Sequence, residues 1–222
     1  MHNSSSNYFE VVDFNRPEAF DIDYLFEQIL PSLGVSLLLG KSSCGKTAAL
    51  LHTAYTLATR KPFGNFKGDK VFEECHSPFH ASPMKKGSTI LFVGEDKHDC
   101  PARVVASEIL YTPEQLQSFP DGRPPIIIVK GGHVKLQDAK QAYELKEALQ
   151  EQIDLYTAYG YPPRLLAFDT LFSCFFVKDQ NNNAEGEAVM SALNIYAEVF
   201  QCHVMATMHP AKSSRADKRS EE

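Results

Sequence analysis

The sequence lacks the features of a membrane protein and of a secreted one. No apolar run reaches the ~20 residues that span a bilayer, and the polar start of the chain, residues 1–8, contains no apolar signal-peptide core. The five cysteines are scattered, and a chain of 222 residues can bury a core without disulfides. We therefore expect a reducing, cytoplasmic setting and no membrane partner.

An excess of positive charge and an internal repeat are also missing. The net charge is −6 and the pI about 5.8. This balance argues against a strongly basic protein that coats nucleic acid, but it leaves room for a local basic patch. No repeat of solenoid period is present. Apolar residues form 43% of the chain and charged residues 23%, as in an ordinary folded protein.

What the sequence does contain is a glycine-rich phosphate-loop motif. The apolar run Val35–Leu39 leads into Gly40–Thr47, which has the form Gly-x-x-x-x-Gly-Lys-Thr, and a helix-forming segment at 48–60 follows. This strand, loop and helix order is the one that a P-loop nucleotide site requires. A chance glycine-rich turn is the alternative, and the flanking strand and helix disfavour it.

The residue types of this loop suit a polyphosphate. Gly40 and Gly45 allow positive φ angles and a close approach of the backbone to a ligand. Loop N–H groups can then face an anion above the positive end of the helix. Lys46 supplies a charge for the β- and γ-phosphates, and the Thr47 hydroxyl can ligate Mg²⁺. We therefore predict that ATP and Mg²⁺ bind here, at Gly40, Lys41, Ser42, Ser43, Cys44, Gly45, Lys46 and Thr47.

Apolar runs and helical patterns alternate along the rest of the chain. Strands are predicted at 88–93, 126–129, 164–168 and 203–208, and helices at 23–29, 47–59, 100–111, 138–159 and 184–200. Residues 171–187 are predicted to form a loop, and 64–88, with several prolines and glycines, a loop insertion. Continuous apolar strands between helices predict an α/β fold whose mostly parallel sheet is covered on both faces.

Polar residues follow three of the predicted strands at one edge of this sheet, where nucleotides bind. Asp169 closes the run 165–168 in the Walker B pattern and can hold Mg²⁺ beside Thr47. Glu95 can orient the attacking water or be a solvated loop acid, and the two interpretations stay equally open. His209 can sense the γ-phosphate or have a structural role, and both remain open.

The insertion also contains side chains that can ligate zinc. They are Cys75, His76 and His80, with His98 and Cys100 further along the chain. The Cys-Cys-His-His finger spacing is absent, so a solvated loop is the default interpretation.

Taken together, these motifs resemble the RecA-like P-loop ATPases of the AAA_25 / RepA-type replicative helicase group, kin of the DnaB and KaiC-like families. The resemblance spans residues 22–212. The strings that carry it lie at 30–47, 56–63, 90–96, 166–171 and 204–212. It implies a RecA-like fold, with Asp169 as the Mg²⁺ ligand, His209 as the γ-phosphate sensor and Glu95 as the catalytic carboxylate acting alongside Lys46.

The resemblance also implies an assembly. Family members form ring-like homo-oligomers, often hexamers, with ATP between subunits and an arginine from the neighbour at each site. The loops after Asp169 and His209 would face a channel that holds single-stranded DNA, with Lys178, Lys212 and Arg215 as candidate contacts. The expected organisation is a flexible segment at 1–21, an ATPase domain at 22–212 and a polar, basic tail at 213–222.

Two departures from the family pattern keep a second function open. Met208 stands where the family has the first of two histidines. The family also continues past this point with strands that carry the arginine finger, so we expect a truncated member or one that lacks efficient catalysis. The favoured function is a Mg²⁺-dependent DNA helicase or translocase ATPase in plasmid, phage or mobile-element replication. The alternatives are a nucleotide-binding regulatory or assembly module with little hydrolysis, and a recombinase or KaiC-like signalling ATPase.

Overall fold

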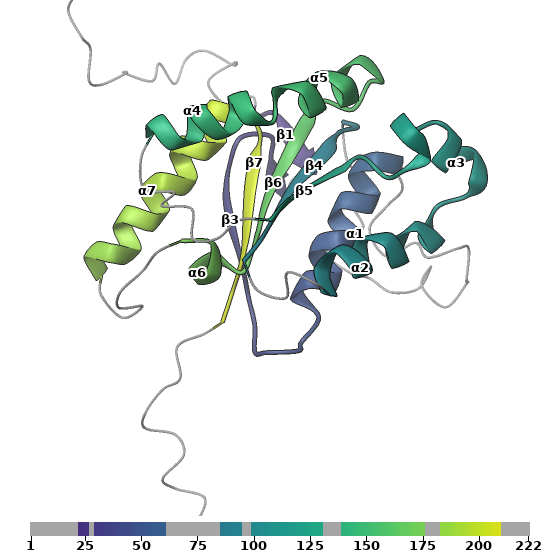
Figure 1. Ribbon diagram of the computed structural model, residues 1–222. Coiled ribbons are helices and arrows are strands. Elements are labelled where there is room, and N and C mark those ends of the chain that lie inside the picture. Colours follow the sequence, from purple (N-terminus) through teal and green to yellow (C-terminus); the bar gives the residue numbers. More distant parts are fainter. Residues whose placement is uncertain are drawn as a thin grey trace, which may run out of the picture.

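The computed structural model describes residues 22–26, 29–60, 85–94, 99–130, 139–175 and 183–209. Within them, a five-stranded parallel sheet lies between two layers of helices (Figure 1). The strand order is β3-β7-β6-β4-β5. The strands are β3 (Gly34–Leu39), β4 (Ser88–Val93), β5 (Ile126–Lys130), β6 (Pro163–Asp169) and β7 (His203–Met208). The predicted α/β, RecA-like P-loop fold is confirmed, and all five strands end at the same edge.

One face of the sheet is covered by the helix that follows the phosphate loop. Helix α1 (Lys46–Thr59) packs Leu50 and Leu57, both fully buried, against the sheet, as its nearly all-apolar sequence predicts. The predicted helix at 100–111 is α2 (Asp99–Ala106) followed by a single 3-10 turn. The short elements beyond it are η3 (Ser107–Leu110), α3 (Pro113–Gln117) and η4 (Pro120–Gly122).

The other face carries the larger core cluster. Its helices are α4 (Ala139–Ala148), α5 (Gln150–Ala158), α6 (Leu171–Cys174) and α7 (Asn183–Phe200). Phe168 of β6 stacks on Phe92 of β4 at 4.6 Å between ring centroids, and Tyr196 of α7 meets Phe168 edge-on at 5.8 Å. These aromatic contacts fix α7 over the strands that end at the predicted site.

Three details of the predicted secondary structure are wrong. The helix predicted at 23–29 is replaced at its start by a strand, because β1 (Tyr24–Phe26) pairs antiparallel with β2 (Leu30–Pro31) and buries Leu25 beside α1. The single helix predicted at 138–159 is divided at Leu149, whose N–H is shared between the carbonyls of residues 145 and 146. The loop predicted at 171–187 contains the short helix α6, whose first turn is capped by a capping box of Thr170 and Ser173, whereas the helix predicted at 184–200 agrees with α7.

Strand β3 also departs from the prediction that both faces are covered. It is an edge strand, and among the described residues it pairs with β7 alone. Leu37 and Leu39, on the same side of the strand, are 38% and 60% exposed. The strand that leads into the phosphate loop is therefore the least covered strand of the sheet's described part.

Several predictions fall outside the described residues. They concern the segment 1–21, most of the 64–88 insertion with its candidate zinc ligands, and the tail 213–222. Within the described ranges, no group of three potential metal ligands from histidine, cysteine and carboxylate side chains is found. In the same ranges, no helix is both long and apolar enough to cross a bilayer.

Candidate functional site

The loop between β3 and α1 has the backbone geometry of a phosphate loop. Ser43 and Gly45 adopt left-handed conformations, with φ of 60° and 91°. Gly45 immediately precedes α1, and its carbonyl accepts the first helical hydrogen bond from the N–H of Ala49 at 2.9 Å. The N–H groups of the first turn of α1 lack helical partners, so this helix end can bind an anion.

Gly40 does not have the positive backbone angle φ that was predicted for it. A Cβ atom at Gly40 would lie 2.5 Å from the Cys44 sulfur, so a side chain at position 40 would require this exposed cysteine to move. The N–H of Gly40 donates to the carbonyl of Met208 at 3.2 Å, which joins the start of the loop to the end of β7.

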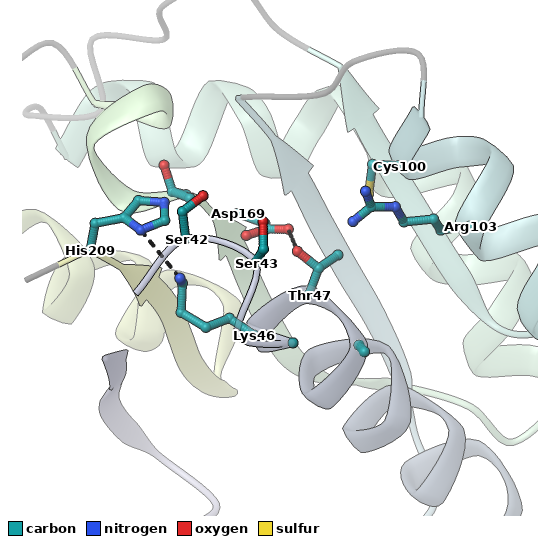
Figure 2. A pocket seen from close by; sticks show the side chains of 11 residues that line it. Ser42, Ser43, Lys46, Thr47, Cys100, Arg103, Asp169 and His209 are labelled. Atoms are coloured by element: carbon teal, nitrogen blue, oxygen red, sulfur yellow. Dashed lines mark hydrogen bonds between the residues drawn. The ribbon is translucent and has the colours of Figure 1, made fainter. Parts of the chain in front are cut away.

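The Lys46 side chain lies across the loop that precedes it. Its ammonium donates to the carbonyls of Gly40 and Lys41, at 2.8 Å each, and lies 3.3 Å from Nδ1 of His209 (Figure 2). The lysine is only 8% exposed. The charge predicted to meet the phosphates is therefore already held at the loop, in contact with the end of β7.

The Asp169 carboxylate accepts two hydroxyl hydrogen bonds, one on each oxygen. Thr47 Oγ1 donates to Oδ2 at 2.6 Å, and Thr207 Oγ1 donates to Oδ1 at 2.5 Å (Figure 2 shows the first). Asp169 is 9% exposed, at the carboxyl end of β6. A hydroxyl and a carboxylate oxygen side by side match the all-oxygen donor preference of Mg²⁺, so the residues present fit that ion.

These side chains line one cavity of about 330 Å³, within the size range of small-molecule sites. The lining residues are Ser42, Ser43, Gly45, Lys46, Thr47, Ala48, Cys100, Arg103, Asp169, Thr170 and His209. The predicted site residues Lys46, Thr47, Asp169 and His209 are thus brought together. Gly40, Lys41 and Cys44 belong to the loop but do not line the cavity.

Among the residues near the cavity that were not predicted from the sequence, Arg103 and Thr207 are functional candidates. Arg103 extends from α2 toward the side of the cavity where Thr47 lies (Figure 2). A signal for it existed, because a helix that follows a parallel strand starts at the binding edge of the sheet. Thr207 lies behind Asp169 and is fully buried. Its signal was a polar residue inside an apolar strand that ends at the same edge.

The remaining predicted site residues, Glu95, Lys178, Lys212 and Arg215, lie outside the described residues. Gly94, which immediately precedes Glu95, donates its N–H to the carbonyl of Asp169 at 3.0 Å. Strand β4 is the neighbour of β6, as the predicted role of Glu95 requires. Gly94, the residue before Glu95 in the sequence, therefore lies directly beside the Walker B strand.

Comparison with protein-family models gives a match over residues 9–215 to a model described as an AAA domain. The matched span includes every strand and helix of the described fold and all residues that line the cavity. A search of curated proteins finds no match.

Proposed function

Because the chain belongs to the AAA domain family of P-loop ATPases, we propose that it binds ATP with Mg²⁺ in the 330 Å³ cavity and hydrolyses it. The family and the fold make it an ATPase-type nucleotide-binding domain. The observation that carries the proposal is that one cavity, beside the phosphate loop, is lined by Lys46, Thr47, Asp169 and His209.

The loop and Lys46 bind the phosphates. The N–H groups of the loop and of the first turn of α1 supply hydrogen-bond donors, and the Lys46 ammonium supplies a positive charge. In the structure this ammonium is bonded to two loop carbonyls and lies beside His209. Phosphate oxygens compete for the same donor, so ligand binding weakens its contact with His209.

Thr47 and Asp169 are the residues that would hold Mg²⁺. When bound, the ion neutralises charge on the phosphate oxygens. Glu95 orients the attacking water and accepts its proton, and its position next to Gly94 supports this role. His209 contacts the Lys46 ammonium. A change in this contact when the phosphates bind or leave would therefore alter the end of β7 and the residues that follow it.

We extend the proposal to a DNA helicase or translocase ATPase of plasmid, phage or mobile-element replication that works as a ring-like homo-oligomer. The family match supports this extension. So does the position of Lys178, Lys212 and Arg215 in segments that directly follow β6-α6 and β7. These three residues would contact single-stranded DNA.

The binding step is tested by equilibrium titration with ATP. Lys46→Ala removes the buried charge of the loop and is expected to abolish ATP binding. Lys140→Ala removes an exposed charge on α4 and is the matched control, which should bind as the wild type does. Equal binding by the Lys46 variant and the wild type would contradict the assignment of the cavity.

The helicase extension is tested by ATPase rates with and without single-stranded DNA, together with size-exclusion chromatography. DNA-stimulated turnover by a ring supports it. A monomer that binds ATP without turnover would instead indicate a regulatory or assembly module.

A further inference from the structure

The Asp169 carboxylate is held from behind by a residue that does not touch the cavity. Thr207 lies on β7, has no exposed surface, and donates its hydroxyl to Asp169 Oδ1 at 2.5 Å. The register explains the contact. Phe168 of β6 pairs with Ala206 of β7, so the residues that follow them, Asp169 on β6 and Thr207 on β7, lie side by side. The pairing of β6 with β7 therefore brings this hydroxyl to the carboxylate.

The two oxygens of Asp169 consequently have different roles. Oδ1 is occupied by Thr207, deep in the sheet, whereas Oδ2 accepts from Thr47 on the cavity side. A carboxylate whose two oxygens have fixed partners cannot rotate freely about its terminal bond. This leaves one oxygen, Oδ2, on the side where a ligand binds.

We propose that Thr207 is a positioning residue that fixes the Asp169 carboxylate so that only Oδ2 faces the Mg²⁺ side of the cavity. The proposal rests on the proposed function, since it concerns the same site. Mg²⁺ requires near-ideal octahedral geometry, whereas Ca²⁺ accepts both oxygens of a carboxylate. A fixed single oxygen therefore favours the smaller ion, and its loss should weaken the binding of Mg²⁺ more than that of Ca²⁺.

The test uses Thr207→Val, which keeps the shape of the side chain and removes the donor, and Thr207→Ser, which keeps the donor. Thr89→Val is the matched control. Thr89 is also a buried strand threonine, on β4, and its hydroxyl has no hydrogen-bond partner among the described residues. The full chain is titrated with Mg²⁺ and, separately, with Ca²⁺ in the presence of a fluorescent ATP analogue, and nucleotide binding is also measured in EDTA.

We expect Thr207→Val to raise the Mg²⁺ concentration for half-maximal binding by about tenfold or more, as for other residues that orient a metal ligand. The Ca²⁺ titration should shift less, and nucleotide binding in EDTA should not change. Thr207→Ser and Thr89→Val should match the wild type. If Thr207→Val does not fold, as judged by circular dichroism, Thr207→Ala removes the same donor without added bulk and gives the same comparison.

A Thr207→Val protein that titrates with Mg²⁺ as the wild type does would overturn the inference and leave the proposed function intact. An equal loss of nucleotide binding in EDTA would also overturn it, because the effect would then be a general distortion of the site. A wild-type protein that binds no nucleotide under any of these conditions would overturn both proposals.

Discussion

Glu95 is the residue on which turnover depends in the proposed mechanism. A substitution at this position can therefore distinguish ATP binding from ATP hydrolysis. It follows Gly94, whose N–H is bonded to the Asp169 carbonyl. Glu95→Gln keeps the size of the side chain but cannot accept a proton. We expect ATP binding to persist and the rate of hydrolysis to fall by roughly 10²- to 10⁴-fold, measured as phosphate release.

Glu187→Gln makes the same chemical change at an exposed position on α7 and provides the control, which should hydrolyse ATP at the wild-type rate. Unchanged hydrolysis by the Glu95 variant would show that another group orients the water.

The separate parts of the site were predictable to different extents. Lys46 and Thr47 belong to one contiguous motif, and Asp169 ends an apolar strand, so local sequence is enough to identify them. Thr207 and Arg103 reach the site through strand register and helix direction. These relations join residues far apart in the chain, so the local signals, a helix after a parallel strand and a polar residue inside an apolar strand, do not by themselves place either side chain at the site.

Strands β3 and β7 are joined by a buried histidine as well as by their hydrogen-bond ladder. His203 starts β7, has no exposed surface, and its Nε2 lies 2.8 Å from Ser36 Oγ on β3. Burial lowers the pKa of His203 to about 4 from the usual 6.5. The folded protein therefore keeps this ring neutral at pH values where the unfolded chain binds a proton.

This depressed pKa of His203 predicts a loss of stability in mild acid. The contribution of the neutral His203 ring to the free energy of unfolding is complete above pH 6.5, the usual pKa. It is lost as the pH falls toward 4, the pKa in the folded protein. Between pH 7.5 and 5, protonation of His203 on unfolding lowers the free energy of unfolding by about 2 kcal/mol. His203→Gln should reduce the pH dependence of the unfolding free energy by that amount, measured by urea denaturation at both pH values.

His52 provides an internal reference, because burial also lowers its pKa to about 4 and it is retained in the variant. Some acid sensitivity should therefore remain after the substitution. Identical pH dependence in the variant and the wild type would show that His203 is not protonated on unfolding in this range.

The elements themselves were largely predictable wherever an apolar run was continuous. Strands β4, β6 and β7 are such runs, and each is confirmed within about one residue of its predicted ends. The β1-β2 hairpin was not predictable, because Leu25 and Phe26 are buried through contacts with α1 that the local pattern does not show. The break at Leu149 was missed because helix-forming residues continue on both sides of it.

At the scale of the whole molecule, a net charge of −6 makes non-specific attraction to DNA weak. Binding of single-stranded DNA must then depend on a few local cations. If Lys178, Lys212 and Arg215 are those cations, replacing all three by alanine should weaken binding. The slope of log affinity against log salt should also become shallower by about 2, since each contact with a single strand contributes ~0.7.

The control for this experiment removes the same number of charges elsewhere. Lys86, Arg123 and Lys140 are exposed, and their joint replacement by alanine should leave the salt slope unchanged. Binding is measured by fluorescence anisotropy at several salt concentrations. Equal slopes for the two triple variants would assign DNA binding to another surface, or show that the protein does not bind DNA.

The edge position of β3 has a consequence for how the domain opens. Within the described fold, this strand is released by breaking one ladder, the one with β7, whereas β6 and β4 each have neighbours on both sides. Amide protons of residues 34–39 should therefore exchange with solvent through a local opening that requires less free energy than global unfolding. A nucleotide held by the adjoining loop raises the free energy of that opening, so deuterium uptake along β3 becomes a direct measure of site occupancy.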